Sequence, residues 1–332
     1  MPMKPTHPYM HLLRAGLAAA LLGAATLAAA QADWPTRPVR VIVPLAAGSV
    51  TDVVLRAAAQ ELQPRLGHPI VIDNKPGASG VVGTDACAKA PADGYTFCAV
   101  YLASMSINPH TIAKLPYDPD KDLVPVGKLF YVTEGLFVPA TLPVGSVAEL
   151  RSYAAAKGNA VNFGTLGEGS LQDLMVAWLN NEWKTRIAGI PYKGGGPISS
   201  ALGAGEIQVG MMGVGNFTGL MQAGKVKPLA VSSQQRSPLL PQVPTMQEAG
   251  LGGFTAHVWW GLAAPAGTPP AAVERLNAEF NRLLKDPKFA EFLQGRYLVP
   301  AGGTSQEFAA FLRTDREQAA TLVKLAARQS AR

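Results

Sequence analysis

Cysteine, histidine and charged side chains are scarce in this chain of 332 residues, and each scarcity excludes a class of function. Two cysteines cannot build a four-cysteine zinc site, and their spacing is not that of a CxxC redox motif. Beyond residue 33 the only histidines are His68, His110 and His257, which lack the HExxH spacing of a metalloprotease. We interpret each as a surface or core residue, and we expect no metal and no cofactor.

Charged residues make up 16% of the chain and form no basic run, so nucleic acid is not an expected partner. The formal net charge is +6, and residues 1–32 contribute two of these positive charges, Lys4 and Arg14, with no acid. The rest of the chain therefore carries 6 − 2 = +4. A mild positive field of this kind favours anionic solutes.

Motifs of the common enzyme classes are also missing. No glycine-rich loop ends in Gly-Lys-Ser or Gly-Lys-Thr. Residues 77–81 (GASGV) depart from the GxSxG nucleophile motif at the last position, and residues 213–215 (GVG) are not followed by the third glycine of a dinucleotide fingerprint. We therefore expect a protein that is not an enzyme, with an exported hydrolase as the weakest alternative.

The N-terminus has the pattern of a secretory signal peptide. Lys4 and Arg14 precede an apolar run over residues 15–30, and Ala30-Gln31-Ala32 has the small-x-small pattern of a cleavage site. We predict a signal peptide over residues 1–32 and a periplasmic protein that begins at Asp33. An uncleaved anchor is the alternative, although the run is short for a membrane span.

Two α/β units follow along the chain. The first alternates three strands with two helices, which predicts a parallel sheet with right-handed crossovers; its elements are expected at 39–44, 51–66, 69–73, 81–89 and 95–101. The second has strands expected at 126–130, 135–138, 161–163, 187–192, 207–212 and 229–232, and helices at 146–157, 171–183, 197–204 and 215–223. Two long amphipathic helices complete the chain. Two similar halves suit a hinged receptor with two lobes.

Two strand-to-helix loops are the best candidates for a binding site, residues 45–52 and 164–170. Their small residues let a ligand approach the backbone, and the helix N-terminus behind each loop offers free N–H groups to a carboxylate. The side of an open α/β sheet at which its strands end is where such sheets bind ligands. Alternatively, both are ordinary turns in which Ser49 or Thr51, and Ser170, only cap helices. The predicted contacts are Ala46, Ala47, Ser49, Thr165, Gly167 and Ser170.

Three other features allow two interpretations each. In residues 192–196, Lys193 and Gly194 either contact an anionic ligand or form a solvated turn. The tryptophans at 259–260 either line a cleft or pack in the core or hinge. Cys87 and Cys98 either form a disulfide or remain buried thiols.

Several short motifs, in order, resemble the Bug receptors, which are the extracytoplasmic solute receptors of tripartite tricarboxylate transporters. These motifs are residues 38–44 (PVRVIVP) with Gly48 and Asp52, 73–78 (DNKPGA), 92–96 (ADGYT), 191–194 (PYKG), 240–245 (LPQVPT), 248–250 (EAG) and 260–269 (WGLAAPAGTP). The resemblance covers essentially all of residues 33–330. It implies an α/β, type II-like periplasmic-binding-protein fold of two lobes with a hinge of two crossover strands, near residues 131–138 and 255–261.

The resemblance also implies a discontinuous domain 1, residues 33–133 and 257–332, and a domain 2, residues 134–256. A small carboxylate, namely a di- or tricarboxylate or an aromatic acid, would be held in the interlobe cleft, with Tyr101, Ser104 and Gly213 as further contacts. The expected partner is the inner-membrane permease, and the expected state is a monomer. A ligand-sensing partner of a signalling system is the alternative role.

The chain departs from the Bug pattern at three places near the expected site. Residues 46–49 (AAGS) stand where Pro-Gly-Gly is more usual, Asp173 stands in place of a frequent His, and Gly213 in place of a frequent Asp. An acid at position 213 would pair with a ligand amine. Its absence predicts a ligand without a cationic group.

Overall fold

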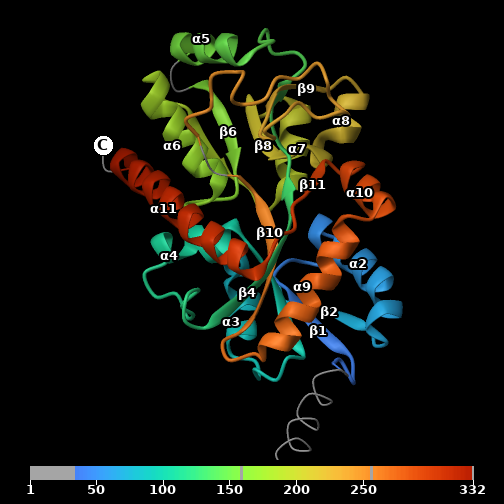
Figure 1. Ribbon diagram of the computed structural model, residues 1–332. Coiled ribbons are helices and arrows are strands. Elements are labelled where there is room, and N and C mark those ends of the chain that lie inside the picture. Colours follow the sequence, from blue (N-terminus) through green and yellow to red (C-terminus); the bar gives the residue numbers. More distant parts are fainter. Residues whose placement is uncertain (1–33, 158–159, 255–256, 331–332) are drawn as a thin grey trace, which may run out of the picture.

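The computed structural model describes residues 34–157, 160–254 and 257–330, which form two α/β lobes stacked end to end (Figure 1). The predicted signal peptide lies outside these residues. Lobe 1 contains a six-stranded sheet of order β11-β4-β10-β3-β1-β2. Its strands are β1 (Val39–Val43), β2 (Ile70–Asn74), β3 (Thr96–Tyr101), β4 (Leu123–Val132), β10 (Trp259–Pro265) and β11 (Leu298–Pro300).

The three strands of the first unit form the predicted parallel sheet, and the antiparallel strands β10 and β11 extend it, so that the whole sheet of lobe 1 is mixed. β1 pairs in parallel with β2 and β3, as predicted. β10 is antiparallel to both β3 and β4, and β11 is antiparallel to β4. β10 begins at the second crossover strand expected near residues 255–261, but its continuation through the sheet to Pro265 was not predicted, and neither was β11. Every residue of β10 is buried, so the strand shows no polar alternation in sequence.

Lobe 2 contains a five-stranded sheet of order β7-β6-β8-β5-β9. β6 is parallel to β7 and β8, whereas β5 is antiparallel to β8 and β9. Its strands are β5 (Glu134–Pro139), β6 (Asn162–Thr165), β7 (Ala188–Pro191), β8 (Val209–Gly213) and β9 (Val226–Val231). The order matches that of lobe 1, with β6 in the place of β1 and β5 in the place of β10.

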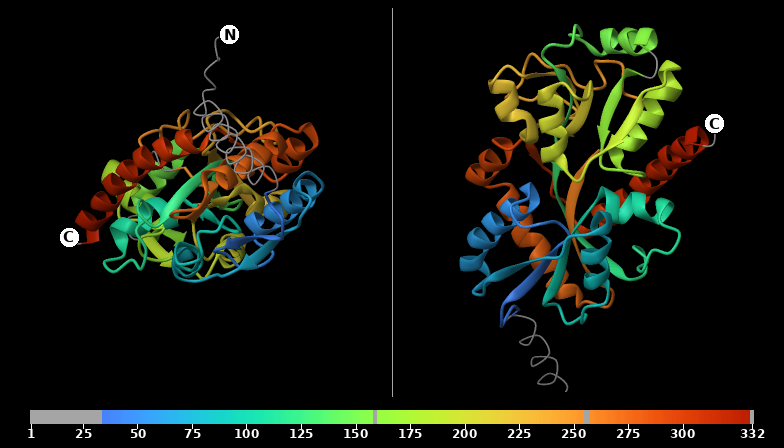
Figure 2. Two further views of the ribbon diagram at one scale, coloured as in Figure 1. Left: turned by 60° about the horizontal axis from the view of Figure 1, so that its bottom comes forward. Right: turned by 180° about the vertical axis from the view of Figure 1, so that it is seen from behind.

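Helices cover both faces of each sheet (Figures 1 and 2). In lobe 1, alternate residues of β1 point to opposite faces: Val41 packs in a core with α2 and α9, and Ile42 packs in another with α11. The helices of lobe 1 are α2 (Val50–Leu66), α3 (Val81–Ala88), α4 (Asn108–Thr111), α9 (Pro270–Leu284), α10 (Pro287–Gln294) and α11 (Ser305–Ser330). Those of lobe 2 are α5 (Val147–Lys157), α6 (Leu171–Trp183), α7 (Gly195–Ala204) and α8 (Thr218–Gln222).

The chain passes between the lobes at the junction of β4 and β5 and again before β10. The two crossings are joined by a hydrogen bond of 2.8 Å from the Val132 N–H to the Val258 carbonyl. Thr133, between β4 and β5, accepts a hydrogen bond from Val214 of lobe 2 and donates one to Tyr297 of lobe 1. The lobes therefore meet at a hydrogen-bonded pair of crossover segments.

Helix α11 ties the second crossing to both lobes. The Trp259 indole N–H donates to the Asp315 carboxylate at 2.9 Å, and the Ser106 hydroxyl donates to the same oxygen. Burial raises the pKa of Asp315, and these two hydrogen bonds oppose the rise. Further along, α11 packs on α6 of lobe 2 (Figure 1), so one apolar core is continuous across both lobes. No helix in the described ranges is long and apolar enough to cross a bilayer.

A disulfide joins Cys87 at the end of α3 to Cys98 in β3, which decides between the two interpretations of these residues. The Cα atoms are 6.0 Å apart, and both residues are fully buried. The bond closes a short loop between a helix and the strand that follows it.

Reduction of this disulfide should lower the free energy of unfolding by about 2–3 kcal/mol, because the unfolded chain regains the entropy of an open loop. Urea unfolding with and without a thiol reductant measures the difference on identical side chains. Because both sulfurs are buried, the reductant should act only as the protein unfolds. Identical unfolding curves would contradict a structural role for the bond.

Candidate functional site

The carboxyl ends of the central strands in each lobe point toward the other lobe. β4 runs parallel to β1 and β3 and passes directly into lobe 2, so all three strands end at the edge that faces lobe 2. β5 enters from lobe 1 and is antiparallel to β8, so β8 and its parallel neighbour β6 end facing lobe 1. The loops after β1 and β6, predicted as binding loops, therefore lie at opposing edges.

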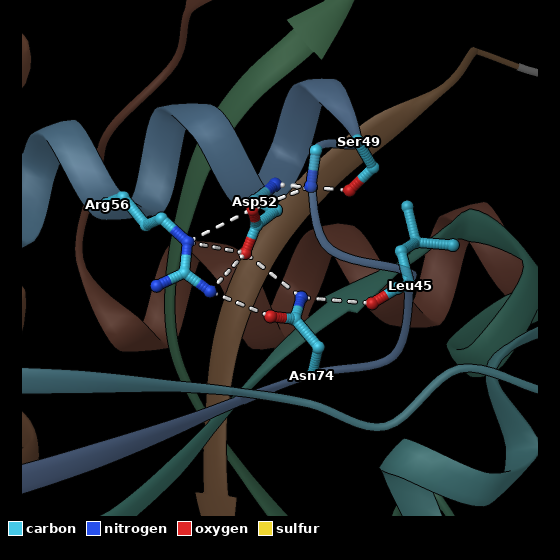
Figure 3. A network of polar contacts seen from close by, with 6 residues as sticks. Leu45, Ser49, Asp52, Arg56 and Asn74 are labelled. Atoms are coloured by element: carbon cyan, nitrogen blue, oxygen red, sulfur yellow. Dashed lines mark hydrogen bonds and ion pairs between the residues drawn. The ribbon is translucent and has the colours of Figure 1, made fainter.

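The loop after β1 is held by the first turn of α2 (Figure 3). Ser49 is the N-cap, and its hydroxyl accepts a hydrogen bond of 3.2 Å from the Asp52 N–H. The Asp52 carboxylate in return accepts a hydrogen bond of 2.9 Å from the Gly48 N–H. Gly48 has φ +81°, which a residue with a Cβ adopts only at a cost. Ala46 and Ala47 remain exposed at the tip of the loop.

Asp52 also anchors the loop to the sheet. Arg56 donates to both carboxylate oxygens, and the Asn74 amide bridges Asp52 and the Leu45 carbonyl, each at 3.0 Å (Figure 3). Burial alone would raise the pKa of Asp52, but the hydrogen bonds from Arg56, Gly48 and Asn74 outweigh it and lower the pKa. The carboxylate therefore stays ionised and fixes the shape of the loop.

The loop after β6 repeats this arrangement. Ser170 is the N-cap of α6 and accepts from the Asp173 N–H, while the Asp173 carboxylate accepts from the Gly169 N–H at 3.0 Å. Both loops share the sequence Gly-Ser-x-x-Asp, at residues 48–52 and 169–173. Asp173 is thus a structural counterpart of Asp52. The repeat was visible in the sequence and would have identified both acids.

The same type of cap occurs at α5, where Gly145, Ser146 and Glu149 take the three positions. That helix begins beyond the carboxyl end of β5, which points away from lobe 1. This type of cap therefore stabilises a helix N-terminus and does not by itself indicate a binding site. The loops at 45–52 and 164–170 are distinguished by their place at the interlobe edges.

These two loops offer hydrogen-bond donors to whatever lies between the lobes. The first N–H groups of a helix have no intrahelical partner, and the positive end of the helix dipole lies beside them. Ser49 and Ser170 use their hydroxyl oxygens as acceptors in the caps, so each O–H remains able to donate. The Thr165 hydroxyl accepts from the Gly167 N–H at 3.3 Å, which shapes the second loop. Two sets of donors facing each other suit an anion.

Other predicted residues of lobe 2 gather at the same edge. The Tyr192 N–H bonds the Thr165 carbonyl at 2.8 Å, which places the turn with Lys193 and Gly194 beside the second loop. Asn216 donates to the Gly213 carbonyl, and its Oδ1 would lie 2.9 Å from a Cβ placed on Gly195. Lys193 is exposed and forms no ion pair with a described residue.

The predicted contacts at the end of β3 are largely used inside lobe 1. Ser104 is fully buried, and its hydroxyl exchanges hydrogen bonds with the backbone of Tyr101 at 3.1–3.2 Å. Burial raises the pKa of the Tyr101 phenol above its usual range. The Tyr101 ring stacks on Trp260 with centroids 4.4 Å apart, and Trp259 is fully buried. The two tryptophans therefore serve core and hinge packing, and Ser104 shapes its own turn.

The described residues contain no group of three or more His, Cys, Asp and Glu side chains suited to a metal ion. His110 lies against the Arg316 carbonyl, and burial lowers the pKa of His257.

Comparison with known proteins identifies the family. Residues 54–327 match the family of tripartite tricarboxylate transporter receptors. The chain is 32% identical to the protein BugT of Bordetella pertussis, over 88% of this chain and 90% of that one. This chain belongs to that receptor family. Two solved structures are similar: an R. palustris protein with adipate (TM-score 0.81, 32% identity, 89% of this chain and 99% of that one) and MatC from Rhodopseudomonas palustris with bound malate (TM-score 0.76, 31% identity, 87% and 100%).

Membership of the family confirms three expectations from the sequence. The resemblance to Bug receptors is correct, the fold is the two-lobe α/β fold of periplasmic solute-binding proteins, and the receptor is not an enzyme. The sequence did not identify five residues in or behind the candidate site. Arg56 and Asn74 hold the first loop. The other three are Gln172 in α6, Glu134 at the crossing and Asn216 beside Gly213.

Replacement of Asp52 by Ala should destabilise the receptor by about 2–3 kcal/mol, because the Gly48 N–H, Arg56 and Asn74 all lose a charged acceptor. Asp173→Ala, the matched variant, removes one hydrogen bond to Gly169 and should cost about 1 kcal/mol. Because folding lowers the pKa of Asp52, its stabilisation is present above the ordinary value of 3.8 and is lost as the pH falls below it. Urea unfolding at pH 7 and pH 3 measures both effects. Equal, pH-independent losses would contradict the argument.

Proposed function

We propose that the receptor captures a small carboxylate between its lobes and delivers it to the inner-membrane permease of a tripartite tricarboxylate transporter. The ligand is a di- or tricarboxylate or an aromatic acid. The observation that carries this proposal is the pair of Gly-Ser-x-x-Asp turns, which cap two helix N-termini at the opposing edges of the two sheets. Related structures hold adipate and malate, which supports a carboxylate ligand here.

In this proposal the ligand carboxylate bridges the two loops and is bound mainly by backbone N–H groups and serine hydroxyls. Such a donor set recognises charge and leaves the remainder of the ligand less constrained. Lys193 adds a cation at the rim. The proposed contacts are Ala46, Ala47, Ser49, Thr165, Gly167, Ser170, Lys193, Gly194 and Gly213. Tyr101 and Ser104 support this site from behind.

Capture requires closure of the lobes, and we propose that they rotate about the two crossings. The moving bodies are residues 33–133 with 257–332, and residues 134–256, and the working unit is a monomer. A bound anion stabilises the closed arrangement, because only there do both loops contact it.

A second interlobe groove lies on the other side of the crossings. It has a volume of about 690 Å³ and is lined by the end of β4, residues 232–238, α10 and β11. β4 and β11 lie at the opposite end of the lobe 1 sheet from β1, and β9 at the opposite end of the lobe 2 sheet from β6. Rotation that brings the binding loops together must therefore widen this rear groove.

We expect a thermal-shift screen of the mature protein to identify one class of carboxylate among linear diacids, citrate-like acids, aromatic acids and acidic amino acids. A ligand at 100 times its Kd adds about 2.7 kcal/mol to the free energy of unfolding, which moves the Tm of a protein of this size by several degrees. No shift with any class, for a protein that starts folded and free of ligand, would contradict the proposal.

Ala47→Trp should abolish binding of the identified acid without lowering the Tm, because Ala47 is exposed in the first loop and a bulky ring would occupy the ligand position. Ala156→Trp on the exposed face of α5 is the control and should bind as wild type. Calorimetric titration measures both. Wild-type affinity in Ala47→Trp would remove the first loop from the site.

Ala290→Trp should strengthen ligand binding severalfold. Ala290 lines the rear groove on α10, and a large ring there holds the groove wide, which favours the closed arrangement before ligand arrives. Lys288→Trp, an exposed position on the same helix outside the lining, should leave the Kd unchanged. Equal or weaker binding by Ala290→Trp would contradict rotation about the crossings.

A further inference from the structure

Glu134 is an acid buried at the first residue of β5, where the chain enters lobe 2. Only 6% of its surface is exposed. Its backbone is fixed by Ser232: the Glu134 N–H donates to the Ser232 hydroxyl at 2.9 Å, and the Ser232 N–H donates to the Glu134 carbonyl at 2.8 Å. Leu136, two residues on and therefore on the same face of β5, packs in the core that contains α6. The Glu134 side chain thus lies on the side of the sheet from which the second binding loop rises.

The Glu134 carboxyl group lies over Gly213. These residues are directly paired in the β5–β8 ladder, and a Cβ placed on Gly213 would lie 3.8 Å from the Glu134 Oε1. Gly213 is the last residue of β8 and one of the proposed contacts. Gly213 stands where the Bug pattern often has Asp, and Glu134 of the neighbouring strand β5 places a carboxyl group beside that position.

Two buried polar atoms at this end of β8 lack partners among the described residues, Glu134 Oε2 and Gln172 Oε1. Gln172 lies in the first turn of α6, is 4% exposed, and donates its amide N–H to the Met211 carbonyl at 3.1 Å. An unpaired buried polar group costs about 1–3 kcal/mol. Two such atoms at the base of one binding loop indicate a place where a ligand supplies the partners.

Burial favours the protonated form of Glu134 at neutral pH. Burial raises the pKa of Glu134 to about 8, and burial is the whole cause. The charged or titratable residues that line the neighbouring rear groove together with Thr133 and Ser232 are Tyr131, Arg236, His257, Glu291 and Tyr297. None of them offsets the shift in the pKa of Glu134. A carboxylic acid without a cation beside it acts as a hydrogen-bond donor.

We propose that Glu134 is a specificity-determining residue of the interlobe site, whose carboxylic acid donates a hydrogen bond to a carboxylate or carbonyl oxygen of the ligand. This inference rests on the proposed function and deepens it. A ligand oxygen can accept a hydrogen bond from the neutral acid of Glu134, which keeps its proton, whereas a ligand ammonium would require the acid to ionise in an apolar site. The site therefore selects for acids whose inner end carries an oxygen and no amine.

The test measures binding of malate and adipate by titration calorimetry at pH 7 and pH 9.5, together with the acid that the thermal-shift panel identifies. These carboxylates stay ionised throughout, so only the protein titrates. With a pKa near 8, the protonated fraction of Glu134 falls about 30-fold at pH 9.5, and wild-type affinity should fall by about tenfold or more. Glu134→Gln keeps a neutral donor, so it should bind as wild type at pH 7 and lose little affinity at pH 9.5.

Two further variants make the result specific. Glu134→Leu removes the donor and should weaken binding at least tenfold at pH 7. Glu206→Gln removes an exposed acid of lobe 2 outside both binding loops and should follow the wild-type pH profile. Identical pH profiles of wild type and Glu134→Gln, or wild-type affinity in Glu134→Leu, would overturn the role of Glu134 and leave the carboxylate receptor in place. If no carboxylate of the panel binds wild type, the proposed function fails and the role of Glu134 fails with it.

The unliganded protein gives a second measurement. Because folding raises the pKa of Glu134, the stability it contributes is present below the unfolded value of 4.5 and is lost as the pH rises to about 8. Glu134→Gln should therefore have a higher Tm than wild type at pH 8, and the difference should vanish below pH 4.5. Equal Tm values at pH 8 would show that folding does not raise the pKa of Glu134 and would overturn the proposal.

Discussion

The hydrogen bond from Val132 to Val258 joins the two segments that connect the lobes, and most of the receptor's geometry depends on it. This bond pairs the two crossing segments side by side, so the lobes are joined at one place. The strand pairings place the loops at this connection: β4 leaves lobe 1 at the edge where β1 and β3 end, and β5 enters lobe 2 at the edge where β6 and β8 end. The candidate binding loops after β1 and β6 therefore lie on one side of the two crossings. The rear groove lies on the opposite side, beside β4, β11 and the segment after β9.

Helix α11 adds a constraint that the crossings alone do not supply. Its Asp315 is bound to Trp259 at the start of β10, while its later turns pack on α6 with apolar side chains such as Leu322 and Ala319. Apolar contact has no preferred direction, so it would permit α6 to shift along α11 in the proposed rotation of the lobes. The polar contact fixes one end of α11 to the hinge, and the apolar surface lets the other end accommodate movement.

The candidate site contains loop N–H groups that are hydrogen-bonded and two buried oxygens that have no partner among the described residues. Asp52 and Asp173 satisfy the Gly48 and Gly169 N–H groups and hold each loop in shape, so the remaining donors do not have to be ordered when a ligand arrives. Glu134 and Gln172 are different, because each keeps a buried oxygen without a partner. Such atoms lower the stability of the unliganded protein, which is typical of positions retained for binding.

Much of this receptor was determined by sequence alone. Helix 171–183 and strands near 39–43 and 96–101 follow from local periodicity, the caps at Ser49 and Ser170 from residues within one turn, and the family from motifs along the chain. These features depend on neighbours in sequence. Tertiary structure alone decided that β10 lies between β3 and β4, that Cys87 bonds Cys98, that Ser104 is enclosed, and that Glu134 lies over Gly213. These depend on strand order and on contacts between distant segments, which leave no periodic pattern in the sequence.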